Sequence, residues 1–137
     1  MLVNETTIKV RYVETDQMGI VHHSNYYTWF EIGRCDFLRE SGITYRAIEQ
    51  EGIMLPLVDS YCKYIEGAKY DDLLTVITRI EEMNGAKIVF NYELVRHEDN
   101  KIIAKGKTTH AFVNEDFNII NVKKANPKVW ETLQSHI

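Results

Sequence analysis

The stretch from Ser24 to Glu40 constrains the fold of this chain more than any other. Apolar residues and one glycine recur at helical spacing along one face and its flank: Tyr26, Tyr27, Phe30, Gly33, Phe37 and Leu38. A helix that is apolar over so much of its surface is normally buried. In a chain of 137 residues it can be buried only if a sheet wraps around it. The sequence therefore predicts one central helix enclosed by a β-sheet.

Gly33 lies in the middle of this helix, where glycine costs about 1 kcal/mol relative to alanine. We interpret the compensation as a close approach of the helix to the sheet. Ser24 and Asn25 are candidate caps for the start of the helix. At its end, Ser41 followed by Gly42 suits a left-handed C-terminal cap.

Most of the remaining chain alternates between apolar and polar residues, as half-buried strands do. Strands are predicted over Thr7–Tyr12, Ile53–Ile65, Leu73–Glu81, Lys87–Val95 and Lys101–Val113, and short helices over Thr44–Gln50 and Pro127–His136. Asn84 and Gly85 supply a tight hairpin between two of the strands. Pro56 indicates an edge strand or a bulge, because proline lacks the amide donor. Ala104 and Gly106 leave room on the inward face, either for a ligand or for the helix.

The order of elements predicts an α+β fold: a strand, a buried helix, and then a meander of four long strands in one antiparallel sheet. With 137 residues and 45% hydrophobic content, the chain suits a single domain over residues 1–137. Exposed edge strands favour pairing between copies, so we expect a homodimer or homotetramer.

Charge and cysteine content exclude several classes of protein. The net charge of -4 at pH 7 argues against nucleic-acid binding, for which a basic face is expected. No apolar stretch approaches the ~20 residues needed to cross a bilayer, so we expect a cytoplasmic protein. Cys35 and Cys62 have apolar neighbours, which predicts free buried thiols and agrees with a reducing compartment.

The stretch from Tyr12 to Phe30 carries the candidate chemistry. Asp16 and Gly19 form a turn just before the helix, so a carboxylate lies opposite the helix start. Unpaired N–H groups and the positive end of the helix dipole favour an oxyanion there, while the carboxylate can act as base or nucleophile. This arrangement suits attack on a carbonyl, although an isolated aspartate near a glycine is more often a turn or cap residue.

The residues around this turn follow one pattern: Tyr12, Thr15, Asp16, Gly19, Ile20, Val21, His23 and Tyr26. With this pattern the chain resembles the hotdog-fold acyl-CoA thioesterases of the 4-hydroxybenzoyl-CoA thioesterase type and their Tol-Pal-associated bacterial relatives. The stretch Ala68–Val76 is similar to that family's turn into its third long strand. Met18 and His22 differ from the family pattern, and because both line the turn they bear on the choice of substrate.

The resemblance implies a hotdog fold, dimers with shared active sites, and hydrolysis of an acyl-CoA thioester without a cofactor. Asp16 is then the catalytic carboxylate, which attacks the thioester to give a mixed anhydride or activates a water. His23 is the second catalytic residue, because its backbone N–H holds the thioester oxygen and, in some relatives, its side chain takes part. The substrate-binding residues implied are Tyr12, Gly19, Val21, His22 and Tyr26. Strand alternation places Tyr12 on the inward face, where it is either a site residue or a core tyrosine.

Other histidines and lysines have simpler interpretations. His22 and His23 are adjacent, and a metal site would need a further ligand, so no metal is predicted. His110 faces inward on its strand and is interpreted as a core histidine with satisfied hydrogen bonds. Five lysines are explained most simply as solvated surface residues, although coenzyme A phosphates would need such a patch: Lys101, Lys105, Lys107, Lys123 and Lys124.

Three alternatives remain open at this stage. A non-catalytic acyl-binding module has no need of Asp16. A hydratase on the same fold would need a histidine that is absent from the required position before the helix. A thioesterase acting on acyl carrier protein would have to bind an acidic partner although this chain is itself acidic, so coenzyme A is the better carrier.

Overall fold

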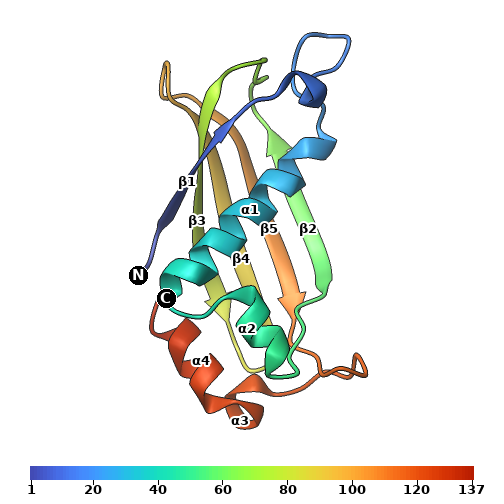
Figure 1. Cartoon of the computed structure of the whole chain (residues 1–137), viewed down its shortest axis with the longest axis vertical. Helices are drawn as coiled ribbons and strands as arrows, with labels where there is room; N and C mark the ends of the chain where they lie inside the picture. The colour runs from blue at the N-terminus through green and yellow to red at the C-terminus, as the bar shows by residue number, and fades with distance from the viewer.

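A computed structural model describes residues 1–137 and contains a five-stranded sheet with one long helix across its concave face (Figure 1). The elements in chain order are β1 (Asn4–Lys9), the 3-10 turn η1 (Tyr12–Glu14), α1 (Ser24–Ser41), α2 (Tyr45–Gln50), β2 (Leu57–Tyr64), β3 (Leu73–Met83), β4 (Lys87–Arg96), β5 (Ile102–Ala111), α3 (Val122–Ala125) and α4 (Pro127–Gln134). The α+β fold with one sheet and one long helix is confirmed. None of the helices combines the length and apolarity that a membrane-spanning segment requires.

The strand order is β1-β3-β4-β5-β2, and every neighbouring pair is antiparallel. The predicted meander of four strands is therefore wrong. Only β3, β4 and β5 form a meander, whereas β2 pairs with β5 and becomes the edge opposite β1. The reason is that the chain after β2 passes from one edge of the sheet toward the opposite edge, where β3 lies beside β1 (Figure 1). Pro56 precedes β2 directly, and the expected edge position and bulge are both present, since the register shifts between Leu57 and Asp59.

The close approach of α1 to the sheet is confirmed at Gly33. A Cβ atom on this glycine would lie 2.6 Å from Thr78 Oγ1 and 2.7 Å from Val76 Cγ1, so no side chain fits there. On β5, a Cβ atom on Gly106 would overlap the ring of Phe30. The room that small residues leave on β5 is therefore filled by the helix.

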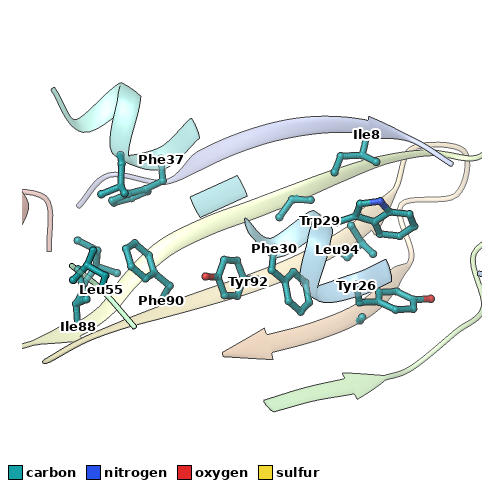
Figure 2. Close-up of a cluster of buried hydrophobic side chains, with 14 of the residues drawn as sticks. Ile8, Tyr26, Trp29, Phe30, Phe37, Leu55, Ile88, Phe90, Tyr92 and Leu94 are labelled. Carbon is teal, nitrogen blue, oxygen red and sulfur yellow. The ribbon is translucent and has the colours of Figure 1, made fainter. Parts of the chain in front are cut away.

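Aromatic rings form the centre of the core between α1 and the sheet (Figure 2). Phe30 stacks on Tyr92 with a centroid distance of 4.6 Å, and Phe37 meets Phe90 edge-on at 5.8 Å. Trp29, Phe30, Phe37, Phe90 and Tyr92 are all fully buried. This core fixes the position of α1 and hence the position of its first turn.

The edge strand β2 differs from the other strands because nearly all of its residues are exposed. Its exposed apolar side chains are Leu57, Val58, Tyr61 and Tyr64. Both cysteines are free and half-buried, so the expected free thiols are confirmed, but they are less buried than the sequence predicts.

Candidate active site

The turn between η1 and α1 holds Asp16 by backbone hydrogen bonds. The Asp16 N–H donates to Ile20 O at 2.9 Å, and the Gly19 N–H donates to Asp16 O at 2.9 Å. One carboxylate oxygen, Oδ1, accepts the Met18 N–H at 2.9 Å. Gly19 has a φ of 82°, which side chains other than glycine rarely adopt. The glycine thus permits the turn that presents the Asp16 carboxylate.

A second set of contacts attaches this turn to the segment that follows β2. The Val21 N–H donates to Ala68 O at 2.8 Å, and Ile20 packs directly on Gly67, where an added Cβ would lie 2.8 Å from the isoleucine Cγ2. The cavity beside Asp16 is therefore formed by two parts of the chain that are distant in sequence.

Glu14 links η1 to α1 and is only 3% exposed. Its carboxylate accepts the Arg11 N–H at 2.7 Å and Trp29 Nε1–H at 2.9 Å, and it pairs with the Arg11 guanidinium at 3.4 Å. Its carbonyl oxygen accepts the N–H of His22 and the side-chain amide of Asn25, both at 2.9 Å. Burial opposes ionisation, but the hydrogen bonds from Arg11 and Trp29 outweigh it and hold the pKa of Glu14 below its usual value.

The start of α1 differs from the prediction that Ser24 and Asn25 cap it. His23 is the N-cap residue and makes no side-chain cap. Instead, the Ser24 N–H donates to His22 Nδ1 at 3.2 Å. The His22 ring lies against that of His23 with a centroid distance of 4.2 Å. The backbone N–H of His23 donates to no group of the protein.

A cavity of about 280 Å³ opens beside this turn and the first turn of α1. Its lining residues are Asp16, Met18, Ile20, Val21, His23, Tyr26, Tyr64, Ile65, Glu66 and Gly67. Four of the predicted site residues thus meet at one cavity: Asp16, Val21, His23 and Tyr26.

Three predicted site residues do not line this cavity. Tyr12 is 78% exposed and packs edge-on against Tyr70, so its expected inward orientation is wrong. The reason is that β1 ends at Lys9 and the backbone then curls into η1, where strand alternation no longer applies. Gly19 shapes the turn but does not line the cavity. The His22 side chain is exposed and lies against the ring of His23.

The sequence did not identify Tyr64 as a cavity residue. It lies at the end of β2, with its ring 5.2 Å from that of Tyr26 and 6.2 Å from that of His23. Burial and the neighbouring Cys62 thiol raise the pKa of Tyr64 to about 12, and burial also raises the pKa of Tyr26. Both phenols are therefore protonated at neutral pH. The pairing of β2 with β5, which no local pattern predicts, brings Tyr64 to this place.

Comparison with known proteins agrees with this arrangement. The model of the Thioesterase-like superfamily matches residues 10–127, and the chain belongs to this family. It is 38% identical over 133 residues to "Putative acyl-CoA thioesterase YneP" of Bacillus subtilis, covering 96% of this chain and 95% of that protein. It is 35% identical over 91 residues to "Acyl-CoA thioesterase YbgC" of Haemophilus influenzae, covering 66% and 67% of the two chains.

Among solved structures, the chain is similar to the DHNA-CoA thioesterase from Staphylococcus aureus. The TM-score is 0.92 at 32% sequence identity, covering 98% of this chain and 91% of the other. The 1,4-dihydroxy-2-naphthoyl-CoA thioesterase from Synechocystis shares the fold with a TM-score of 0.85 at 18% identity. The resemblance to hotdog-fold thioesterases that the sequence indicated is confirmed.

Glu14→Gln tests the link between η1 and α1. The variant loses the charge that Arg11 and Trp29 stabilise, and hydrogen bonds to charged groups contribute about 1.5–3 kcal/mol, so we expect a lower unfolding temperature. Because the pKa of Glu14 lies below the value of 4.5 for an unperturbed glutamate, its contribution is present above pH 4.5 and is lost as the pH falls. Thermal unfolding at neutral and acidic pH measures both effects. The exposed Glu5→Gln is the matched control, and equal acid sensitivity in wild type and Glu14→Gln would contradict the assignment.

Proposed function

We propose that the protein hydrolyses acyl-CoA thioesters, with Asp16 as the catalytic carboxylate and the His23 backbone N–H as the oxyanion donor. The observation that carries the proposal is that Asp16 and His23 line one cavity at the start of α1. The N–H of His23 has no acceptor in the protein, and the positive end of the α1 dipole lies at the same place. Membership of the thioesterase family supports the reaction class.

Two routes are compatible with this arrangement. In the first, an Asp16 oxygen attacks the thioester carbon, the C–S bond breaks, the CoA thiolate leaves, and water hydrolyses the mixed anhydride. In the second, Asp16 removes a proton from a water whose oxygen attacks the same carbon, and the thiolate leaves with a proton. Both routes place negative charge on the thioester oxygen, and one positioned donor contributes a factor of about 10²–10³ in turnover.

The walls of the cavity suit a thioester. Val21, Ile20 and Ile65 supply apolar surface, and the protonated hydroxyl groups of Tyr26 and Tyr64 supply hydrogen-bond donors. The apolar part of this wall lowers the local dielectric around the thioester and so strengthens the hydrogen bond to the oxyanion.

Coenzyme A is the proposed carrier because relatives at 38% and 35% identity are named for acyl-CoA. One relative, "Acyl-acyl carrier protein thioesterase ATL3, chloroplastic" of Arabidopsis thaliana, is 24% identical over 119 residues and represents the alternative carrier. A non-catalytic binding module remains the less favoured reading, because Asp16 with a free oxyanion donor beside it has no role in simple binding. A cytoplasmic location also stays a prediction, which the two free thiols support.

Substitutions at Asp16 and His23 distinguish a catalytic role of a side chain from a catalytic role of a backbone N–H. Asp16→Asn removes the charge that attacks or deprotonates, so turnover should fall by about 10²–10⁴ or more with the fold intact. His23→Ala deletes the imidazole but keeps the backbone N–H, so turnover should fall much less than in Asp16→Asn. Release of free thiol from a panel of acyl-CoAs measures both. Near-normal turnover by Asp16→Asn would contradict a mechanism that uses this carboxylate. An equal fall in turnover in both variants would mean that the His23 imidazole takes part in the reaction.

Two of the five lysines that were candidates for coenzyme A phosphates are paired with carboxylates. Lys107 pairs with Glu81 at 2.7 Å, and Lys101 lies 3.4 Å from Glu66. Lys105 forms no ion pair, and it lies opposite Lys63 on β2 and opposite Glu93 on β4. Like charges placed directly opposite each other repel, so a bound phosphate would stabilise this pair. Lys123 and Lys124 belong to α3, at the end of the molecule away from the start of α1 (Figure 1).

Replacing Lys63 and Lys105 together with alanine should raise the KM for acyl-CoA with kcat nearly unchanged, the signature of lost uniform binding. Added salt should weaken wild-type binding in the same direction because it screens the attraction. Lys107→Ala is the matched control, since that lysine already has an acidic partner. Steady-state kinetics on one acyl-CoA measure the effect, and an unchanged KM in the double variant assigns both residues to solvated surface.

We also propose that β2 pairs with a second copy of the chain, giving a homodimer or homotetramer. Its outer edge has no neighbouring strand, and its exposed apolar side chains include Val58 and Tyr61. Unpaired edges with apolar side chains are normally covered. A partner at this edge would lie beside Tyr64 and therefore beside the catalytic cavity.

Light scattering should give at least twice the monomer mass of 16.0 kDa. Val58→Lys should lower the measured mass and the thioesterase activity together, because a charge at the centre of an apolar interface is costly. Ile119→Lys, at an exposed apolar residue that does not belong to β2, is the control. A wild-type mass of 16.0 kDa at micromolar concentration would contradict the proposed assembly.

A further inference from the structure

A second cavity, of about 410 Å³, is lined by residues of α1, β2 and β5. Tyr27, Glu31 and Arg34 line it from α1, Ser60 lines it from β2, and Thr108 lines it from β5. It follows the catalytic cavity along both elements, since Tyr26 and Tyr64 line the first cavity and Tyr27 and Ser60 line the second. Arg34 lies roughly 16 Å beyond His23 along the helix axis, and the Cα–Cβ bonds of a helix tilt toward its start, which shortens the span to the first cavity.

Arg34 is a half-buried cation with unused hydrogen-bond donors. Its Nη1–H donates to Tyr92 Oη at 3.2 Å, whereas its buried Nε–H has no partner. It forms no ion pair with any carboxylate. Burying a charge without a partner is costly, so an acceptor placed in this cavity would be bound favourably.

A chain of hydrogen bonds holds Arg34 in place and fixes the direction of every proton. Leu55 O can only accept, so His110 Nδ1, 3.0 Å away, carries the proton and His110 Nε2 accepts from Thr108 Oγ1 at 2.9 Å. Thr108 in turn accepts from Tyr92 Oη at 2.7 Å, and Tyr92 accepts from Arg34. Burial and the charge of Arg34 lower the pKa of His110 to about 4, which agrees with a neutral ring and confirms the predicted core histidine.

We propose that this second cavity receives the far end of the acyl group, and that Arg34 and Glu31 select acyl groups that carry a hydroxyl there. The inference rests on the proposed thioesterase function. Arg34 offers only donors and Glu31 only acceptors, and a hydroxyl both accepts and donates. A terminal carboxylate would accept from Arg34 but would be repelled by Glu31 and could donate nothing to it, and a plain alkyl end would displace water from both charges without replacing its hydrogen bonds.

The test compares three acyl-CoAs of equal chain length: octanoyl-CoA, 8-hydroxyoctanoyl-CoA, and the mono-CoA thioester of octanedioic acid. In the wild type, kcat/KM for the hydroxylated substrate should exceed that for the other two by about tenfold to a hundredfold, the range expected for one charge-assisted hydrogen bond. Arg34→Met should reduce this preference at least tenfold, and Arg34→Lys should restore part of it. Glu31→Gln should raise the relative rate on the dicarboxylic substrate.

The controls distinguish a role of Arg34 in selecting the acyl group from a role in maintaining the structure. Arg39→Met removes an exposed arginine of the same helix, which pairs with Asp36 at 2.6 Å, and should leave the preference unchanged. Equal loss by Arg34→Met on octanoyl- and hydroxyoctanoyl-CoA, or a changed mass in light scattering, would make Arg34 a residue of the core or of the interface and overturn the inference. A wild type that cleaves all three substrates at equal rates would also overturn it while leaving the proposed function standing. Hydrolysis of none of them, or of any other acyl-CoA, would contradict the proposed function itself.

Discussion

The close contact between α1 and the sheet at Gly33 is the constraint on which the rest of the structure depends. With no side chain at this position, the helix backbone lies against Val76 and Thr78 of β3, and Phe30 reaches the space above Gly106 on β5. Once the helix is fixed there, its first turn projects from the sheet beside the end of β2. The cavity proposed as the catalytic site exists because this turn, the preceding loop and the end of β2 meet at one point. Packing density in the core therefore determines the geometry of the site.

The sequence predicted the elements better than it predicted how they pair. The central helix was expected over Ser24–Glu40 and is present over Ser24–Ser41, because its apolar spacing is strong and local. The third predicted strand was expected from Leu73 and begins there. The pairing of β2 with β5 was missed, because strand order depends on how the chain crosses the sheet between Tyr64 and Leu73, and no periodic pattern records that crossing.

The same contrast applies to the site. Asp16, Val21, His23 and Tyr26 were predicted and line one cavity, because they belong to one continuous motif. Tyr12 was misplaced, since the 3-10 turn that exposes it depends on hydrogen bonds to the buried carboxylate of Glu14, a tertiary effect that alternation cannot reveal. Tyr64 was missed because it reaches the cavity from a distant strand. Local patterns thus identify the residues of a motif, and the tertiary structure decides what surrounds them.

The attachment of the site turn to the segment after β2 has a consequence for how such a protein changes over evolutionary time. The groups proposed for the chemistry lie on the turn from Asp16 to His23, whereas much of the facing wall comes from Tyr64 to Gly67. The two parts are joined by the backbone hydrogen bond from the Val21 N–H to Ala68 O and by the contact of Ile20 with Gly67, neither of which involves the side chain of Tyr64. A backbone attachment survives most side-chain replacements. Mutations at the end of β2 can therefore reshape the pocket for a new acyl group while the inherited reaction is preserved, so that substrate range and catalysis are free to diverge separately.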